Sequence, residues 1–261
     1  MDNAIIKQHI SRQFNLEMED IRNKVLTMGG LVEQQVEMAT NAFMAYDLEN
    51  AEKVIQQDNL INALEKDIDH ECTEILAKRQ PAAFDLRMLI ATIKIITDLE
   101  RIGDEAARIA KVTMRLEATE HGHENYYEIE HLLNLVREML NGSLDAYART
   151  DVEEVVAITA KDSKVDREYT SITRQLITKM MEDPRNITRA LDVLWTARAL
   201  ERIGDHSCNA AFDPGPDHIV VATRYVGQAE TGHVYCHCRA LFVFCRALFV
   251  FVFFFPTKTK Q

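Results

Sequence analysis

The stretch Glu100-Arg101-Ile102-Gly103-Asp104 is repeated without change as Glu201-Arg202-Ile203-Gly204-Asp205, at a separation of 101 residues. A second match extends the repeat toward the N-terminus, at a separation of 104 residues. It aligns Phe43 with Tyr147, Asp47 with Asp151, Val54 with Ile158, Asp58 with Asp162 and Ile61 with Val165. The difference of three residues falls near Pro81 and Pro184, where a loop can absorb it. Self-similarity at a fixed period indicates an internally duplicated fold.

Both halves show the apolar spacing that is typical of amphipathic helices. The spaced residues are Val54, Ile61, Ile68 and Ile75 in the first half and Ile158, Val165, Ile172 and Leu176 in the second. Helix breaks are expected at 45–48, 79–81, 117–127, 149–151 and 183–184, which leaves three helices in each half. A kink is expected where Gly29-Gly30 interrupts the first helix. Long helices joined by short loops run antiparallel to bury their apolar faces, so we predict an all-α fold of two tandem three-helix bundles.

These bundles give the predicted domain boundaries. Residues 1–118 form the first bundle, and residues 119–211 form the second, whose last helix is cut short by the breaker Asp213-Pro214-Gly215-Pro216. Residues 212–261 form a tail that we expect to be disordered. This tail repeats residues 238–244 as residues 245–251 and reads like translation out of frame.

Charge and cysteine content narrow the classes of function. The chain has 41 acidic and 30 basic residues, and a net charge of −11 disfavours binding to nucleic acid or to an anionic membrane. Residues 1–13 lack the basic start and apolar run of a signal peptide. Cys72 is the only cysteine in the first 207 residues. We therefore expect a cytoplasmic protein without a disulfide framework.

The repeated motif places two carboxylates on one helix face. Leu86, Leu89, Ile90, Ile93 and Ile96 lead to Glu100 and Asp104, just as Ile187, Ala190, Leu191 and Leu194 lead to Glu201 and Asp205. Glu100 and Asp104 lie about 20° either side of the direction of Ile93, so they continue what we interpret as the core-facing stripe. Burying like charges without a positive partner would cost several kcal/mol.

One aspartate of the preceding helix is expected to join each pair. A hairpin that turns near residues 80–81 sets Asp58 opposite about residue 103, and a turn near 183–184 sets Asp162 opposite about residue 205. Three converging carboxylates in each half form a pocket that suits Mg²⁺, Mn²⁺ or iron. The predicted ligands are Glu100, Asp104 and Asp58 in one site, and Glu201, Asp205 and Asp162 in the other.

Ordinary ion pairing is the alternative for these acids. Arg87, Arg101, Arg108 and Arg202 could neutralise them between helices. Gly103 and Gly204 each cost about 1 kcal/mol in a helix relative to alanine and signal close approach of a neighbour. Tight helix packing accounts for these glycines as well as a metal site does.

Several segments resemble the PhoU family over about residues 9–209. They are residues 9–15, 28–33, 79–83, 98–105 and 181–185, together with the second motif copy at 201–206. The resemblance implies two three-helix bundles about a pseudo-twofold axis, frequent homodimers, and metal at Glu100, Asp104, Glu201 and Asp205. Whether the metal is Mg, Mn, Fe or Zn stays open. Asp58 and Asp162 are added from the hairpin geometry alone.

The resemblance also implies a function. PhoU-like proteins are negative regulators of phosphate uptake and of the phosphate-starvation (Pho) regulon. They link the ATPase subunit of the phosphate ABC transporter to the sensor histidine kinase of the phosphate two-component system, and they meet the membrane only through these partners.

Two other functions stay open. A carboxylate-bridged metal oxidase would use Glu-x-x-His pairs on core helices, but this spacing occurs only at Glu120–His123, Glu128–His131 and Glu230–His233. A structural helical adaptor without metal would use the acidic motifs as ion pairs. No phosphate loop or nucleophile motif is present in the sequence, so we do not expect an enzyme.

Overall fold

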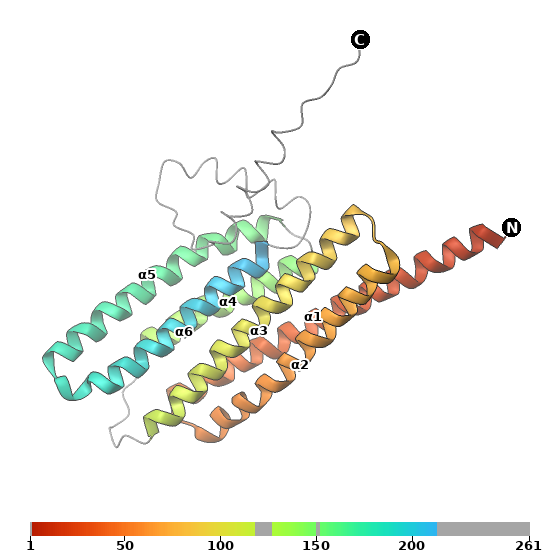
Figure 1. Cartoon of the computed structure of the whole chain (residues 1–261). Coiled ribbons are helices and arrows are strands. Elements are labelled where there is room, and N and C mark those ends of the chain that lie inside the picture. The colour runs from red at the N-terminus through yellow and green to blue at the C-terminus, as the bar shows by residue number, and fades with distance from the viewer. Residues whose placement is uncertain (1, 118–126, 150–151, 213–261) are drawn as a thin grey trace, which may run out of the picture. The chain divides into compact units, whose positions relative to one another are not determined.

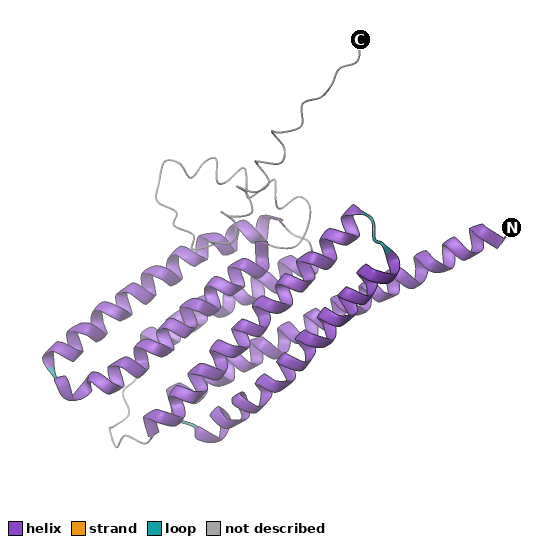
Figure 2. Cartoon of the chain, viewed as in Figure 1, coloured by secondary structure: helices purple, strands orange, loops and turns teal. Residues whose placement is uncertain are grey.

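The computed structural model describes residues 2–117, 127–149 and 152–212, and all its elements in these ranges are helical (Figures 1 and 2). The helices are α1 (Asp2–Ala45), α2 (Leu48–Arg79), α3 (Ala83–Glu117), α4 (Tyr127–Arg149), α5 (Val152–Glu182) and α6 (Ile187–Phe212). A short 3₁₀ turn, Pro184–Asn186, precedes α6. The predicted all-α fold is confirmed, with three helices in each half.

Local sequence accounts for the observed helix ends. The side chain of Asp47 caps α2 by accepting a hydrogen bond from the backbone N–H of Asn50 at 3.1 Å. At the other end Gln80 adopts the left-handed conformation, with φ of 46°, and Pro81 follows it. Asp183 caps the 3₁₀ turn by accepting from the backbone N–H of Arg185 at 3.1 Å. The breaks expected at 45–48, 79–81 and 183–184 are therefore present.

Each half packs as a bundle of three helices, with α1, α2 and α3 in one bundle and α4, α5 and α6 in the other. The two bundles join where α3 packs on α6 and α1 packs on α4, and together they form one compact unit (Figure 1). The predicted stripes of α2 and α5 are buried in its core. The fold thus buries the faces that the periodicity of these two helices indicated.

The predicted core face of α3 and α6 is partly wrong. Leu86 and Ile90 of α3 are 38% and 45% exposed, and Ile187 and Leu191 of α6 are each 41% exposed. The reason is that α3 contacts α1, α2 and α6 on three sides, so its buried arc is wide and centred elsewhere. Leu89 and Ile96 of the same predicted stripe are fully buried, so the stripe that leads into Glu100 lies at the boundary between the core and the surface.

Gly29 and Gly30 both lie inside α1, which continues as one helix to Ala45. A Cβ atom added at Gly29 would lie 2.4 Å from Cδ2 of Leu144, whereas one added at Gly30 would meet no atom within 4 Å. Gly29 therefore makes room for α4 where the first helices of the two bundles pack together.

Two ion pairs and one hydrogen bond, between Asp98 and His206, fix the register of α3 against α6. Asp98 pairs with His206 at 2.9 Å, Glu105 with Arg202 at 2.8 Å, and Arg115 with Asp192 at 2.9 Å. Residue numbers rise along α3 while they fall along α6, so the two helices are antiparallel. This is the arrangement that a pseudo-twofold axis between duplicated helices produces.

Some expectations fall on other parts of the chain. The tail at 213–261 and most of the linker at 117–127 lie outside the described residues, so the hypothesis of a frameshifted tail stays a prediction. Within the described ranges, no helix combines the length and apolar character that a membrane span needs.

Candidate functional site

The first acidic cluster comprises Asp58 and Glu65 of α2 with Glu100 and Asp104 of α3. Gly103 brings these helices close together, since a Cβ atom at this residue would lie 3.5 Å from Oδ1 of Asp58 and 3.4 Å from Cδ1 of Ile61. Asp58 is thus beside the repeated motif, in the register that the hairpin predicts. Glu100 and Asp58 are half-buried, while Asp104 is exposed.

The carboxylates of this cluster repel one another. Burial raises the pKa of Glu100, and the negative charges of Asp104, Glu65 and Asp58 raise it further. Burial also raises the pKa of Asp58, against the lowering effect of a hydrogen bond from Gln35, and the charge of Asp104 adds to the increase. The cluster therefore holds excess negative charge, which a bound cation would relieve.

A buried glutamine adds polar atoms to the first cluster. Gln35 of α1 is fully buried, and its Nε2 donates hydrogen bonds to the carbonyl oxygen of Val54 at 3.2 Å and to Oδ1 of Asp58 at 3.4 Å. Its Oε1 has no hydrogen-bond partner and lies 3.0 Å from where a Cβ of Gly103 would be. A buried amide oxygen, which could accept a hydrogen bond or ligate a cation, is therefore left without a partner beside the acids.

The second acidic cluster comprises Glu201 and Asp205 of α6 with Asp166 of α5. Glu201 is only 8% exposed, and burial together with the charge of Asp205 raises its pKa to about 7, although Arg198 acts in the opposite direction. Oε1 of Glu201 accepts a hydrogen bond from Arg198, whereas Oε2 is buried without a hydrogen-bond partner. Asp162 lies on α5 and is buried, and the α5 acid whose charge raises the pKa of Glu201 is Asp166, one turn further on.

The two clusters are not equivalent. Met139 of α4 stands where the duplication places Gln35, and a Cβ at Gly204 would lie 3.9 Å from its Cε and 3.3 Å from Cγ1 of Val165. The second cluster therefore has an apolar wall where the first has an amide. Sequence reasoning missed Gln35, Glu65 and Asp166. The helical spacing offered a clue to Glu65, which shares one helix face with Asp58 and Asn62. The duplication offered a clue to Asp166, which aligns with Asn62.

The arginines neutralise these acids only in part. Arg108 and Arg202 both pair with Glu105, an acid outside the predicted site, at 3.0 and 2.8 Å. The charge of Arg101 lowers the pKa of Glu100, but less than burial and the neighbouring acids raise it. Arg87 lies exposed on α3.

The side chains as they lie do not form a closed coordination shell. Over the described ranges, no three His, Cys, Asp or Glu side chains converge in a way that could hold a metal ion. The features that suit a cation are the buried Oε2 of Glu201, the unpaired Oε1 of Gln35 and the raised pKa values of the acids around them.

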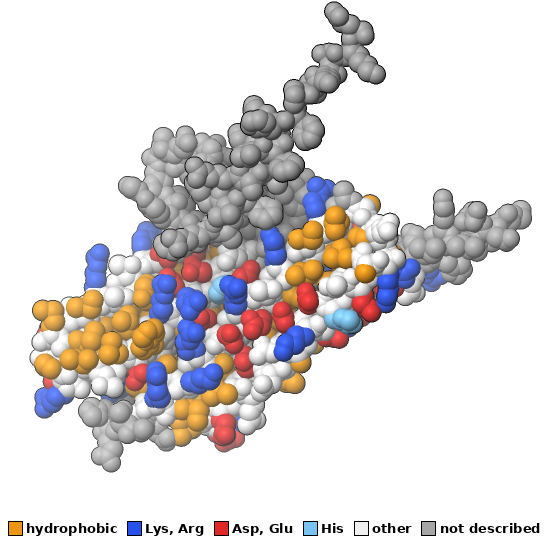
Figure 3. Space-filling view, in the orientation of Figure 1, with side chains coloured by type: hydrophobic (Ala, Val, Ile, Leu, Met, Phe, Trp, Pro, Cys, Tyr) orange, Lys and Arg blue, Asp and Glu red, His pale blue; other side chains and the backbone are white. Residues whose placement is uncertain are grey.

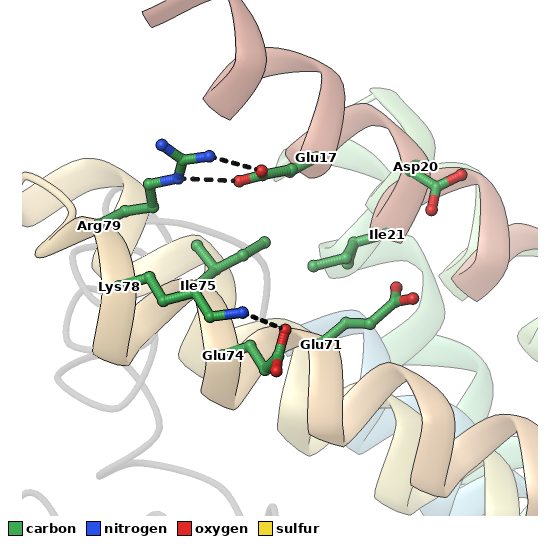
Figure 4. A pocket seen from close by; sticks show the side chains of 8 residues that line it. All are labelled: Glu17, Asp20, Ile21, Glu71, Glu74, Ile75, Lys78 and Arg79. Atoms are coloured by element: carbon green, nitrogen blue, oxygen red, sulfur yellow. Dashed lines mark hydrogen bonds and ion pairs between the residues drawn. The ribbon is translucent and has the colours of Figure 1, made fainter. Parts of the chain in front are cut away.

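A separate hollow of about 210 Å³ lies between α1 and α2, near the C-terminal end of α2 (Figure 4). Its charged walls pair internally, since Arg79 donates to Glu17 at 2.7 Å and Lys78 donates to Glu74 at 2.7 Å. The two other acids of the lining, Asp20 and Glu71, pair with Lys24 of α1. Ion pairs therefore account for the charges of the hollow without a ligand.

Comparison with known proteins gives a consistent result. A family model described as the PhoU domain matches residues 25–113 and again residues 129–213. The chain is similar to the phosphate-specific transport system accessory protein PhoU homolog of Pseudomonas aeruginosa, with 47% identity over 79% of this chain and 85% of that protein. It is 45% identical to the accessory protein PhoU of Escherichia coli, over 80% of this chain and 86% of that one.

Solved structures agree with the sequence matches. A crystal structure of PhoU from P. aeruginosa superposes with a TM-score of 0.75 at 44% identity, over 81% of this chain and 99% of that one. The phosphate transport system regulatory protein PhoU from Streptococcus pneumoniae superposes with a TM-score of 0.71 at 27% identity, over 85% of this chain and all of that one. The duplicated helices, the paired motifs and these matches together show that the chain belongs to the PhoU family.

Proposed function

We propose that this protein is a metal-binding negative regulator of phosphate uptake and of the phosphate-starvation regulon. In this role it works in the cytoplasm as an adaptor between the ATPase subunit of the phosphate ABC transporter and the sensor histidine kinase. The names of its relatives, which are accessory and regulatory proteins of phosphate transport, support the phosphate-related part of the proposal. A homodimer is the proposed assembly.

The buried Oε2 of Glu201 is the observation that carries the metal-binding part. An ionised carboxylate with one oxygen buried and unpaired is costly, and a cation beside it removes that cost. Glu100, Asp104 and Asp58 would hold an ion in the first cluster, and Glu201, Asp205 and Asp162 in the second. Oxygen donors suit Mg²⁺, Mn²⁺ or iron, with Zn²⁺ as a further option. The bound ion would supply positive charge that ties α2 to α3 and α5 to α6.

A structural adaptor without metal is the second candidate, and the pairing of Arg198 with Glu201 favours it. Metal analysis of protein purified without chelator separates the two. We expect bound metal in the wild type and the loss of most of it in the double variant Glu100→Gln/Glu201→Gln. The control Glu74→Gln, on the exposed surface of α2, should keep its metal.

The double variant must keep the helical circular dichroism of the wild type for this comparison to be valid. Equal metal content in the two proteins would contradict the metal sites and leave the structural adaptor. Oxygen consumption after iron loading would instead support a carboxylate-bridged oxidase.

A further inference from the structure

An apolar patch covers the α5–α6 end of the molecule (Figure 3). It consists of Ile177 and Met181 of α5 with Ile187, Leu191 and Trp195 of α6, which are 47%, 79%, 41%, 41% and 55% exposed. The three α6 residues are four apart and share one face of the helix. The hairpin turn near Pro184 sets Ile177 opposite Leu191 and Met181 opposite Ile187. Single exposed apolar residues are common on proteins, but a contiguous group marks an interaction surface.

Arginines continue this face of α6 beyond the patch. The side chains of Arg198 and Arg202 are 45% and 41% exposed, and Arg108 lies beside them on α3 with 50% exposure. Their carboxylate partners lie beneath the surface, since Glu201 is 8% and Glu105 is 4% exposed. The outer layer is therefore cationic, on a chain whose net charge is −11.

The first half of the chain does not reproduce this surface. Leu86 and Ile90 stand at the positions of Ile187 and Leu191, but Lys94 replaces Trp195, Thr73 replaces Ile177 and Ala77 replaces Met181. The apolar patch is therefore a feature of the second bundle and not a by-product of the repeat. Tryptophan and arginine are also the residues that most often dominate binding energy at interfaces.

We propose that this surface, the apolar patch together with Arg198 and Arg202, binds an acidic amphipathic helix of a partner protein. The inference rests on the proposed adaptor function and names the surface that the partner would use. From Ile187 to Arg202 the face is about 22 Å long, which matches a helix of about 15 residues. The partner helix places apolar side chains against Leu191 and Trp195 and carboxylates against the guanidinium groups. A second copy of this chain fits less well, because its own α6 face brings arginines and no exposed row of acids.

The single tryptophan makes a direct test possible, because Trp195 is the only one in the chain. The full chain is labelled with 5-fluorotryptophan, and its fluorine NMR signal is followed during titration with the purified ATPase subunit of the phosphate transporter. A synthetic helix of about 16 residues, with one leucine face followed by a turn of glutamates, is the second probe. Binding of each probe is also measured independently by biolayer interferometry.

The matched variants are Leu191→Ser and Ile90→Ser, since the duplication equates these positions and their exposures are similar at 41% and 45%. We expect the ATPase subunit to shift the Trp195 signal, Leu191→Ser to weaken its binding about tenfold or more, and Ile90→Ser to change it less than about twofold. Added salt should weaken binding of both probes, because the arginines contribute charge.

The outcomes separate this inference from the adaptor function. If the subunit binds while the Trp195 signal stays unchanged, the inference is overturned and the adaptor function stands. If only the synthetic helix binds and shifts the signal, the surface is supported and the adaptor role toward the ATPase fails. If neither probe shifts the Trp195 signal, the inference is wrong. It is also wrong if dilution of the chain alone shifts this signal, because that result would mean that a second copy covers the patch.

Discussion

Nη1 of Arg202 lies 2.8 Å from Oε1 of Glu105, so the arginine of the second motif copy contacts the acid that directly follows the first copy. His206 stands in the second half where Glu105 stands in the first, and it reaches back to Asp98 at 2.9 Å. The repeated motif therefore has two structural roles. Its glutamates, Glu100 and Glu201, lie near acids of the neighbouring helix in their own bundle, whereas its second arginine, Arg202, and the residues that flank the two copies connect the bundles.

Replacing Arg202 with glutamine should destabilise the protein. Glu105 is 4% exposed, and the change removes one of the two arginines that pair with it, leaving the ion pair with Arg108 at 3.0 Å. A buried charge with weakened compensation costs about 1–3 kcal/mol in the free energy of unfolding. Urea denaturation followed by circular dichroism measures this cost.

The control for this change is Arg185→Gln, which breaks an ion pair whose arginine side chain is 87% exposed. It should leave the urea midpoint close to that of the wild type, because solvent screens an exposed ion pair. Similar costs for both variants would show that the pair between the bundles is no stronger than a surface pair.

Stability should fall as pH rises through 7, in protein kept free of metal by a chelator. Because the pKa of Glu201 is raised to about 7 in the folded protein from an ordinary 4.5, its protonated form is favoured by folding. This contribution is fully present below pH 4.5 and is lost as pH rises through 7. Glu201→Gln removes it, so relative to the wild type the variant should gain roughly 2 kcal/mol between pH 5 and pH 8.5. Parallel pH profiles of the two proteins would contradict the buried, half-paired state of Glu201.

Gly29 and Gly30 should respond in opposite ways to alanine. Gly30→Ala meets no atom within 4 Å and should stabilise α1 by about 0.5–1 kcal/mol through helix propensity. Gly29→Ala pushes against the Leu144 side chain, at 2.4 Å from Cδ2, and should cost about 1–2 kcal/mol. Thermal unfolding of the two variants gives the comparison, and a stabilised Gly29→Ala protein would mean that α1 and α4 do not pack this closely.

Removing the cap of α2 should also be measurable. Asp47→Ala loses the hydrogen bond to the backbone N–H of Asn50 and should lower the free energy of unfolding by about 1 kcal/mol. Asp47→Asn keeps an accepting oxygen and should stay within a few tenths of the wild type. An equal loss in both variants would point to the charge of Asp47 and not to the cap.

The sequence predicted the helices and their pairing because both depend on local signals. The breakers at Asp47, Gln80-Pro81 and Asp183-Pro184 end or begin helices in the structure, and the hairpin between α2 and α3 sets Asp58 beside Gly103 as predicted. Helical spacing fixes which residues share a face, but it does not say how many neighbours cover that face. Ile90 and Leu191 were therefore assigned to the core, although they are exposed.

The candidate site was predictable only where the motif itself repeats. Gln35 contributes from α1, and nothing in its own segment indicates that α1 passes behind Gly103. Glu65 and Asp166 act through charge across a helix pair, so they are recognisable only once the register is known. The duplication aligns Gln35 with Met139, and the significance of this difference is clear only once the structure shows that each residue lies beside its acidic cluster.

The adaptor claim is tested most directly by a pull-down with the transporter ATPase subunit and the cytoplasmic part of the sensor kinase, with and without metal. The full chain should retain both proteins in the presence of Mg²⁺ or Mn²⁺, and should retain less after chelation or in Glu100→Gln/Glu201→Gln. Retention of neither protein would contradict the adaptor function, and equal retention in every condition would contradict its coupling to the acidic clusters.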